Sequence, residues 1–390
     1  MLKLPIYLDH NATTPCDPAV VAAMLPYFSS HFGNAASRNH SFGWQAEEAV
    51  NIARGQVAEL IGSEAKEIIF TSGGTEAANL AVKGVFDMYR SKGNHIITCN
   101  IEHKAVLDTC KHLEKEGAEI TYLGVNNEGL IDLNELKAAF KPTTILVAII
   151  YANNEIGTLM PVKEISSIAK NKGVLFFSDA TQAVGKIPVD VNRDGIDLMA
   201  FSSHKMYGPK GIGALYVRRK NPRVKLTAQF DGGGHERGMR SGTLNVPGIV
   251  GFGKACELCM LEMNEDVKRI SRLRDKLENA ILNLEATYLN GSKKLRLPNV
   301  TNISFEYADG ESLLMGINKN IAVSTGSACM SATLEPSYVL KSLGVNDKLA
   351  SSALRFSLGR STTEEEIDYT IEQVKGTVNK LREMSPQPES

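Results

Sequence analysis

The sequence lacks the features that mark several classes of protein. Lys and Arg total 43 against 44 for Asp and Glu, so no net charge would draw the chain to nucleic acid or to an anionic membrane. No apolar run reaches the roughly 18 residues of a membrane span. Pro5 and Asp9 break the first apolar run too early for a signal-peptide core. We therefore expect a cytoplasmic protein that acts on a small molecule, with no nucleic-acid or membrane partner.

Cysteine is also sparse. The six cysteines are scattered through 390 residues at positions 16, 99, 110, 256, 259 and 329. Such spacing does not resemble a disulfide framework, so we expect reduced thiols. Cys256 and Cys259 form a C-x-x-C pair within a helical stretch that has no second ligand pair nearby. This context favours helix positions over a metal or redox site.

Between residues 67 and 219 the chain alternates short β-rich apolar runs with longer helical patterns. This alternation is typical of βαβ units and predicts an α/β domain with a mainly parallel, seven-stranded sheet. The expected strands are Glu67–Thr71, His95–Cys99, Glu119–Leu123, Ile145–Tyr151, Leu175–Ser178, Asp197–Phe201 and Gly213–Val217. The expected helices between them are Thr75–Tyr89, Lys104–Lys115, Asp132–Phe140 and Pro161–Asn171.

The rest of the chain predicts a smaller α+β domain. Asp17-Pro18 is a good start for a helix through about Ser29, and a capping-box pattern from Ser361 precedes the closing helix. The other expected elements are a helix over 261–284, strands Thr301–Phe305 and Leu354–Leu358, and a helix over 363–381. We expect a large domain over 16–260 and a small domain formed by 1–15 and 261–390.

Polar residues follow the predicted strands, at the sheet edge where α/β proteins bind ligands. These groups are Ser72–Thr75, Glu102–His103, Asn153–Glu155, Asp179–Gln182 and Ser202–Lys205.

Three of these groups suit an anionic, carbonyl-bearing cofactor, although each also has an ordinary structural interpretation. The glycines of Thr71–Glu76 let backbone N–H groups approach a phosphate at a helix N-terminus, but a Gly-Gly turn is more often simple strand-to-helix punctuation. Asp179 follows an apolar strand and needs a cationic partner there, such as a protonated pyridine nitrogen, or it is a helix cap. Lys205 is either a desolvated amine able to form a Schiff base or an ordinary surface lysine.

Cys329 lies in the segment Ser324–Ala332, which consists almost wholly of small residues. Small side chains anchor a loop poorly, so we expect this loop to be mobile. A thiol on a mobile loop suits a group that collects an atom in a cleft and delivers it outside, whereas inert cysteines have apolar neighbours.

The order of these motifs along one chain resembles the cysteine desulfurase family of the IscS/NifS type, closest to IscS. The resemblance rests on ten segments spread over nearly the whole sequence: 7–15, 71–79, 102–103, 153–155, 179–182, 202–205, 235–243, 324–329, 334–337 and 355–360. It implies the type I fold of pyridoxal-phosphate (PLP) enzymes, similar to aspartate aminotransferase, and a homodimer with active sites near the subunit interface.

The resemblance also implies roles for individual residues. Lys205 would hold PLP as a Schiff base, and Cys329 would receive the sulfur. Asp179 would pair with the pyridine nitrogen and Gln182 with the phenolic oxygen, while His103 would stack on the ring and shuttle protons. The phosphate would be held by Gly74, Thr75, Ser202 and His204, with Thr243 from the other subunit. Asn154 and Arg355 would bind the substrate carboxylate.

The implied reaction converts L-cysteine to L-alanine and leaves a persulfide on Cys329. The implied acceptors are the Fe–S scaffold protein IscU, with which Cys329 would transiently share an Fe–S cluster as a ligand, and a tRNA-thiolation relay. Two departures concern the acceptor side: Met330 replaces a small polar residue, and the chain stops at Ser390, short of a segment that helps relatives dock IscU.

Other functions stay open on the residues alone. Selenocysteine lyase or aminotransferase-like activity would use the same scaffold, although transamination needs no protein thiol. A catalytically silent sulfur carrier or assembly scaffold is a third reading, which a colourless protein unable to bind PLP would favour.

Overall fold

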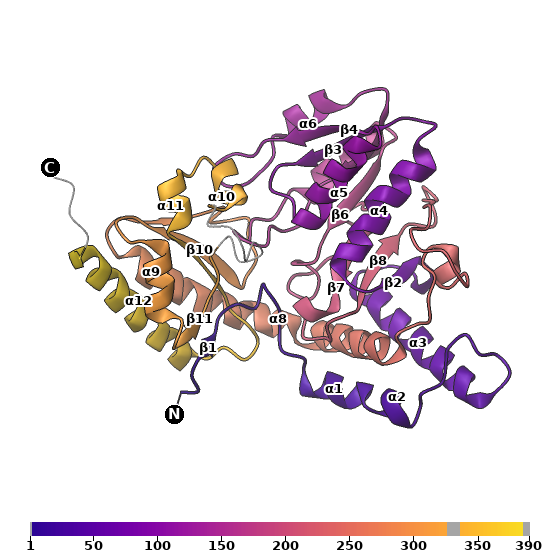
Figure 1. Ribbon diagram of the computed structural model, residues 1–390, viewed down its shortest axis with the longest axis horizontal. Helices are drawn as coiled ribbons and strands as arrows, with labels where there is room; N and C mark the ends of the chain where they lie inside the picture. Colours follow the sequence, from indigo (N-terminus) through magenta and orange to yellow (C-terminus); the bar gives the residue numbers. More distant parts are fainter. Residues whose placement is uncertain (1, 326–335, 385–390) are drawn as a thin grey trace.

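The computed structural model describes residues 2–325 and 336–384, and they form two lobes (Figure 1). The large lobe contains a seven-stranded sheet. Its strands, in spatial order, are β2 (Ile68–Thr71), β8 (Gly213–Val217), β7 (Leu198–Ser202), β6 (Leu175–Asp179), β5 (Thr144–Ala148), β3 (His95–Cys99) and β4 (Glu119–Leu123). Strands β7, β6, β5, β3 and β4 pair in parallel, and only β8 runs antiparallel to its two neighbours. The predicted fold class is confirmed.

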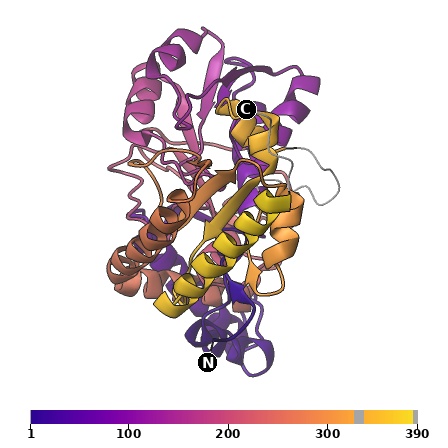
Figure 2. The same cartoon turned by 90° about the vertical axis from the view of Figure 1, so that its left-hand side faces the viewer.

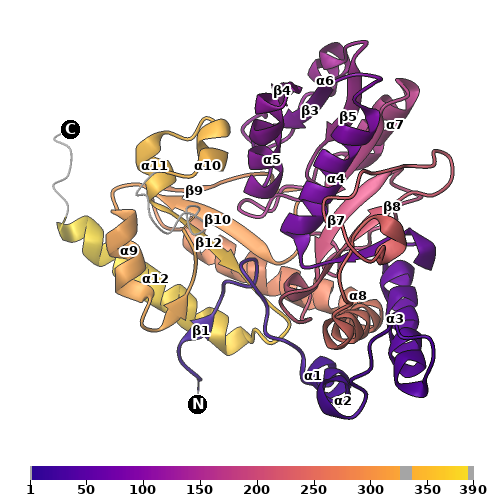
Figure 3. The same ribbon diagram turned by 45° about the vertical axis from the view of Figure 1, so that its right-hand side comes forward.

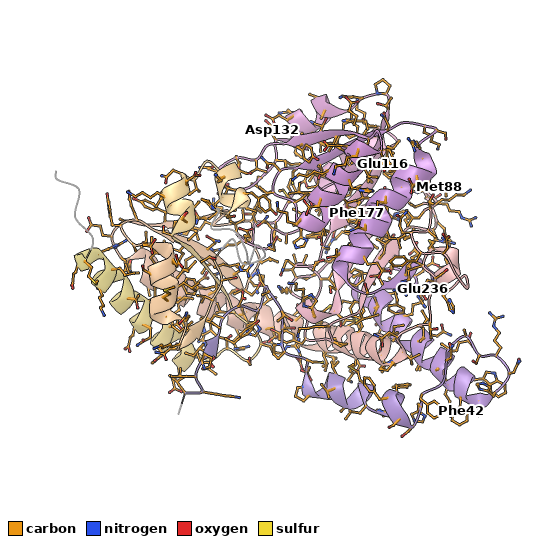
Figure 4. The ribbon with its side chains drawn as sticks, viewed as in Figure 1. Phe42, Met88, Glu116, Asp132, Phe177 and Glu236 are labelled. Carbon is orange, nitrogen blue, oxygen red and sulfur yellow. The ribbon has the colours of Figure 1, made fainter. Side chains whose placement is uncertain are left out.

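Helices cover both faces of this sheet. One face packs on α4 (Gly74–Tyr89) and α5 (Lys104–Lys115), and the other on α3 (Ser41–Leu60), α6 (Leu133–Ala139), α7 (Val162–Asn171) and the first half of α8 (Val246–Leu282). Side chains alternate between the two layers, since Phe176 belongs to the core on the α3 side and Phe177 to the core on the α4 side (Figure 4).

The small lobe is built on a three-stranded antiparallel sheet in the order β12 (Ala353–Ser357), β10 (Val300–Phe305), β9 (Thr287–Leu289). A two-stranded parallel sheet joins β1 (Ile6–Tyr7) to β11 (Ile321–Ala322). The helices are α9 (Gly310–Ile317), α10 (Tyr338–Ser342), α11 (Asp347–Ser351) and α12 (Glu364–Met384), and α12 runs along the outside of the lobe (Figure 2). The predicted boundary at residue 260 stays a prediction.

Two predicted helices have different bounds. The helix expected over 17–29 is capped by Asp17 as predicted, but it divides at Leu25 into α1 (Pro18–Met24) and α2 (Pro26–Ser29), because Pro26 starts a new helix. Helix α8 begins at Val246, not near residue 261. It therefore includes Cys256 and Cys259, which are buried, as the helical reading of that pair expects.

The N-terminal segment crosses between the lobes (Figure 3). It leaves β1 in the small lobe, where Asp9 bridges to Ser357, and reaches the large lobe, where the Thr14 amide donates to the carbonyl of His204. The segment therefore lies against the ends of β7 and β12. Among the residues described, no helix is long and apolar enough to cross a membrane.

Candidate active site

A cradle for an anion lies where β2 turns into α4. Gly73 precedes this 16-residue helix without a side-chain cap, so the first amides and the positive end of the helix dipole are open to a ligand. A Cβ on Gly74 would lie 2.9 Å from Thr181 Oγ1 and 3.7 Å from Ser202 Cβ. Glycine therefore leaves free space between residues at or just after the ends of three strands. A phosphate fits this space and the open backbone amides at the start of α4.

Asp179 ends β6 next to this cradle. Its side chain is buried, and its Oδ1 accepts a hydrogen bond from the Thr181 amide. Within the described part of the chain no Lys, Arg or His forms an ion pair with it. A buried carboxylate that lacks a cation is costly, so a protonated pyridine nitrogen is a fitting partner.

Lys205 and Gln182 converge on one acceptor. Lys205 Nζ donates to the carbonyls of Asn11 and Ala12, each at 2.6 Å, and Gln182 Nε2 donates to the same Asn11 carbonyl at 2.9 Å. In PLP the aldehyde and the phenolic oxygen are on adjacent ring carbons. Two donors that share one acceptor are close enough to meet these two groups, so the residues fit the cofactor.

The two predicted site histidines have defined hydrogen-bond partners. His103 is the N-cap of α5, and its Nδ1 accepts from the Ala105 amide at 3.1 Å, which leaves the proton of the neutral ring on Nε2. His204 Nδ1 lies 3.1 Å from Thr13 Oγ1. Burial, followed by repulsion from Lys205, Lys210 and Lys186, lowers the pKa of His204 to about 4, so this ring is neutral at pH 7.

Arg355 and Asn154 meet where the two lobes face each other. Arg355 Nη1 donates to the Asn154 carbonyl at 3.0 Å, and Nη2 donates to Asp9 Oδ1 at 2.7 Å. In the described chain, Arg355 Nε and Asn154 Oδ1 are buried without a hydrogen-bond partner. An unpaired buried donor is costly, so Arg355 is suited to receive a carboxylate through Nε, whereas Asn154 could donate to one only through its amide nitrogen Nδ2.

Two predicted site residues are not brought into this group. Thr243 is exposed on the large lobe. Cys329 lies outside the described residues. Its described flank is held at Ser324, whose amide and carbonyl pair with those of Arg355. No cluster of three or more potential metal ligands occurs in the part of the chain that the structure describes.

Several residues without a predicted role also border the site. Asn11 binds Lys205, Gln182 and the amine of Lys186, a partly buried lysine. Glu102 precedes His103 and is fully buried, and burial raises its pKa well above the usual range. Segment 7–15, one of those that carry the family resemblance, includes Asn11 but gave it no role, and nothing local marked Lys186.

Comparison with known proteins gives a consistent family. The aminotransferase class-V model matches residues 6–370. The chain is 58% identical to "Cysteine desulfurase IscS" of Pectobacterium carotovorum subsp. carotovorum (strain PC1) and 57% identical to the protein of that name from Salmonella typhi. Each match extends over 387 residues, which is 99% of this chain and 95% of the relative.

Solved structures share the whole architecture. A "NifS-like protein" superposes with a TM-score of 0.90 at 37% identity, over 96% of this chain and all of that one. "SspA in complex with cysteine" superposes with a TM-score of 0.81 at 36% identity, over 90% of this chain and 98% of that one. The similarity therefore includes both lobes and the site between them.

Proposed function

The chain belongs to the aminotransferase class-V family as a PLP-dependent cysteine desulfurase of the IscS/NifS type, and on that premise we propose how its residues carry out the reaction. The enzyme converts L-cysteine to L-alanine and supplies sulfur for Fe–S cluster assembly. The observation that carries the proposal is the convergence of Lys205 and Gln182 on Asn11, beside the buried Asp179. Bound PLP supplies an aldehyde for the substrate amine and a ring that absorbs negative charge from the substrate Cα.

The residues of the large lobe hold the cofactor. Lys205 joins the aldehyde, and Asp179 keeps a proton on the ring nitrogen. Gln182 donates to the phenolic oxygen. The phosphate lies at the N-terminus of α4, bound by Gly74, Thr75, Ser202 and His204, with Thr243 of a second subunit. His204 serves as a neutral donor, because its pKa is about 4.

Two residues orient the substrate, and two move its protons. Arg355 would bind the carboxylate through Nε, which is otherwise unpaired, and Asn154 would donate to it through Nδ2. The amine of Lys205, when not joined to the cofactor, would take the proton from the substrate Cα. His103 stacks on the ring and exchanges protons through Nε2, because Nδ1 is held by the Ala105 amide.

Sulfur leaves through Cys329. Its thiolate attacks the substrate sulfur, so an S–S bond forms while the C–S bond breaks. The electron pair of the broken bond stays with the carbon skeleton, which is protonated and departs as alanine. The product on the protein is a Cys329 persulfide.

We also propose a homodimer and its acceptors. The exposed position of Thr243 supports a second subunit at the phosphate. The acceptors are the scaffold protein IscU, with Cys329 as a transient Fe–S ligand, and a tRNA-thiolation relay. Free thiols are typical of a reducing compartment, and the described cysteines are all free, so we assign the protein to the cytoplasm.

Two substitutions separate cofactor attachment from sulfur transfer. Lys205→Ala should abolish turnover and the adduct that borohydride traps on residue 205 of the wild-type protein. Cys329→Ser should keep the yellow cofactor and still bind cysteine, but form no persulfide. The assay mixes protein, PLP, cysteine and a thiol reductant, and it measures alanine and sulfide together.

Each outcome tests one role. A wild-type protein without a pyridoxyl group on residue 205 after borohydride would overturn the role of Lys205. A Cys329→Ser variant that forms alanine at the wild-type rate would overturn the role of Cys329. Cys16→Ser is the matched control, since Cys16 is the described cysteine that is only half-buried, and we expect no change in either product.

A further inference from the structure

A second lysine, Lys186, lies next to Gln182, one of the residues proposed to hold the cofactor, and it has no part in the mechanism above. Lys186 is partly buried, and its Nζ donates to Gln182 Oε1 at 2.5 Å and to Asn11 Oδ1 at 2.9 Å. Both acceptors are uncharged amide oxygens. Among the described residues no carboxylate forms an ion pair with Lys186. Such a lysine is uncommon in a protein interior, where lysines are usually paired with an acid.

The surroundings disfavour a charge on this amine. Burial lowers the pKa of Lys186 well below its usual range, and repulsion from Lys205 and Arg355 lowers it further. His10 and Tyr207 line the same small cavity, and Asp266 of α8 is its one acidic group among the described residues. Lys186 therefore acts here as a hydrogen-bond donor to two amide oxygens, and not as a member of an ion pair among the described residues.

The bonds of Gln182 fix the direction of its side-chain amide. Lys186 occupies the oxygen Oε1, while the nitrogen Nε2 donates to the Asn11 carbonyl, which can only accept. A flipped amide would point its oxygen at that carbonyl. One hydrogen of Nε2 is used by Asn11, so the second is left for the phenolic oxygen of the cofactor.

We propose that Lys186 is a positioning residue that holds the Gln182 amide with its N–H group, not its oxygen, toward the phenolic oxygen of PLP. The inference rests on the proposed function, in which Gln182 faces that oxygen. Lys186 itself touches no reacting atom. Its effect is to set how strongly the bound cofactor's phenolate is stabilised, and hence the protonation of the imine nitrogen joined to Lys205.

The test is a pH titration of the visible absorption of the bound cofactor in Lys186→Met. Methionine has a similar length but no hydrogen to donate, so the Gln182 amide should loosen. The deprotonated imine leaves the full phenolate charge on the ring, and the Gln182 N–H stabilises that form most. Losing the bond should therefore raise the midpoint of the titration by about one pH unit.

A double-mutant cycle separates positioning from a general structural effect. Gln182→Leu removes the proposed target, so it should raise the midpoint by itself, and adding Lys186→Met should change it little further. Lys163→Met, an exposed lysine of α7, is the matched control and should titrate as the wild type. Lys186→Gln retains a donor, so its midpoint should lie between those of the wild type and Lys186→Met.

The outcomes distinguish this inference from the function on which it depends. A Lys186→Met protein that titrates as the wild type, or whose shift persists in full in the Gln182→Leu background, would overturn the positioning role. A wild-type protein that shows no visible cofactor band would instead refute the proposed attachment to Lys205.

Discussion

Asp9 controls how much positive charge Arg355 offers to a substrate. The two side chains form an ion pair of 2.7 Å in which Arg355 is almost fully buried and Asp9 mostly so. A substrate carboxylate must therefore approach a guanidinium that already has one carboxylate partner. The repulsion between the two carboxylates weakens the binding of the substrate and also of the alanine product, which has the same carboxylate. We infer that Asp9 favours product release.

Asp9→Asn tests this inference. The asparagine oxygen can still accept from Arg355 Nη2, but the negative charge is gone, so L-alanine should inhibit more strongly, with its inhibition constant about fivefold lower. The measurement is competitive inhibition by alanine at constant pH. Asp9→Ala removes the acceptor too and should weaken alanine binding, because Arg355 is no longer held. Equal inhibition constants in Asp9→Asn and the wild type would contradict the role.

At the scale of single elements, most of the large-lobe sheet was predictable. Strand β3, strand β4 and helix α5 have the predicted bounds, because their apolar patterns are bordered by clear breaks. Strand β5 was predicted to continue to Tyr151 but ends at Ala148. The amides of Ile149 and Tyr151 nevertheless donate hydrogen bonds to carbonyl groups of β6, including that of its last residue. This difference is one of boundary definition.

Other elements could not be predicted from the sequence because tertiary packing, and not a local pattern, determines them. Helix α3 buries Ala46, Ala49 and Ala53, which give a weak hydrophobic pattern. The start of α8 contains glycines that appear unsuited to a helix, but a Cβ on Gly253 would lie 2.6 Å from the Ala53 Cα. The glycine is needed because the two helices pack closely. The contact of Lys186 with Asn11, 175 residues apart, is equally invisible in the sequence.

Glu155 links helix α10 to the end of β5. Its Oε2 accepts from the Ser337 hydroxyl at 2.5 Å, and Ser337 caps α10. Burial raises the pKa of Glu155 to about 7, against the lowering effects of Ser337, Arg355 and Lys104. The folded protein therefore binds this proton more tightly than the unfolded chain does. Its contribution to stability is full below about pH 4.5 and is lost as the pH rises to about 7.

Glu155→Gln should remove this pH dependence. Glutamine can still accept from Ser337 but cannot ionise, so the variant should match the wild type at pH 5 and be more stable at pH 8, by roughly 1–3 kcal/mol. Urea unfolding at both pH values measures the difference. Glu164→Gln, at an exposed position of α7, is the control. A stability difference that is the same at pH 5 and pH 8 would contradict the raised pKa.

At the scale of the whole molecule, the N-terminal segment and the continuous helix α8 join the two lobes (Figure 1). The side chain of Arg360 adds a further connection near the site. Arg360 Nε donates to Asp266 at 2.8 Å and Nη1 pairs with Glu262 at 2.9 Å, both on α8, while the guanidinium lies 4.3 Å from the Tyr207 ring centroid. Because Tyr207 follows Lys205 by two residues, Arg360 connects the small lobe to the segment that contains Lys205.

The large lobe also exposes apolar side chains that a single chain does not cover. Leu25, Phe28, Phe32 and Phe42 are each about half exposed or more, and the Phe32 and Phe42 rings contact each other with centroids 5.3 Å apart. Leu25 lies between α1 and α2, Phe28 lies on α2, Phe32 follows α2, and Phe42 lies at the start of α3, where Figure 4 labels it. A contiguous exposed apolar patch is typical of an interface, so we assign this surface to the proposed homodimer.

The double substitution Phe28→Asp and Phe32→Asp tests that assignment. Two buried charges without partners would oppose association, so the protein should become a monomer at micromolar concentration, measured by light scattering. Loss of the second subunit would also remove Thr243 from the phosphate, so PLP affinity should fall with the dimer. Met315→Asp, at an exposed apolar residue on α9, is the matched control and should stay dimeric. A double variant that remains a dimer with unchanged PLP affinity would place the interface elsewhere.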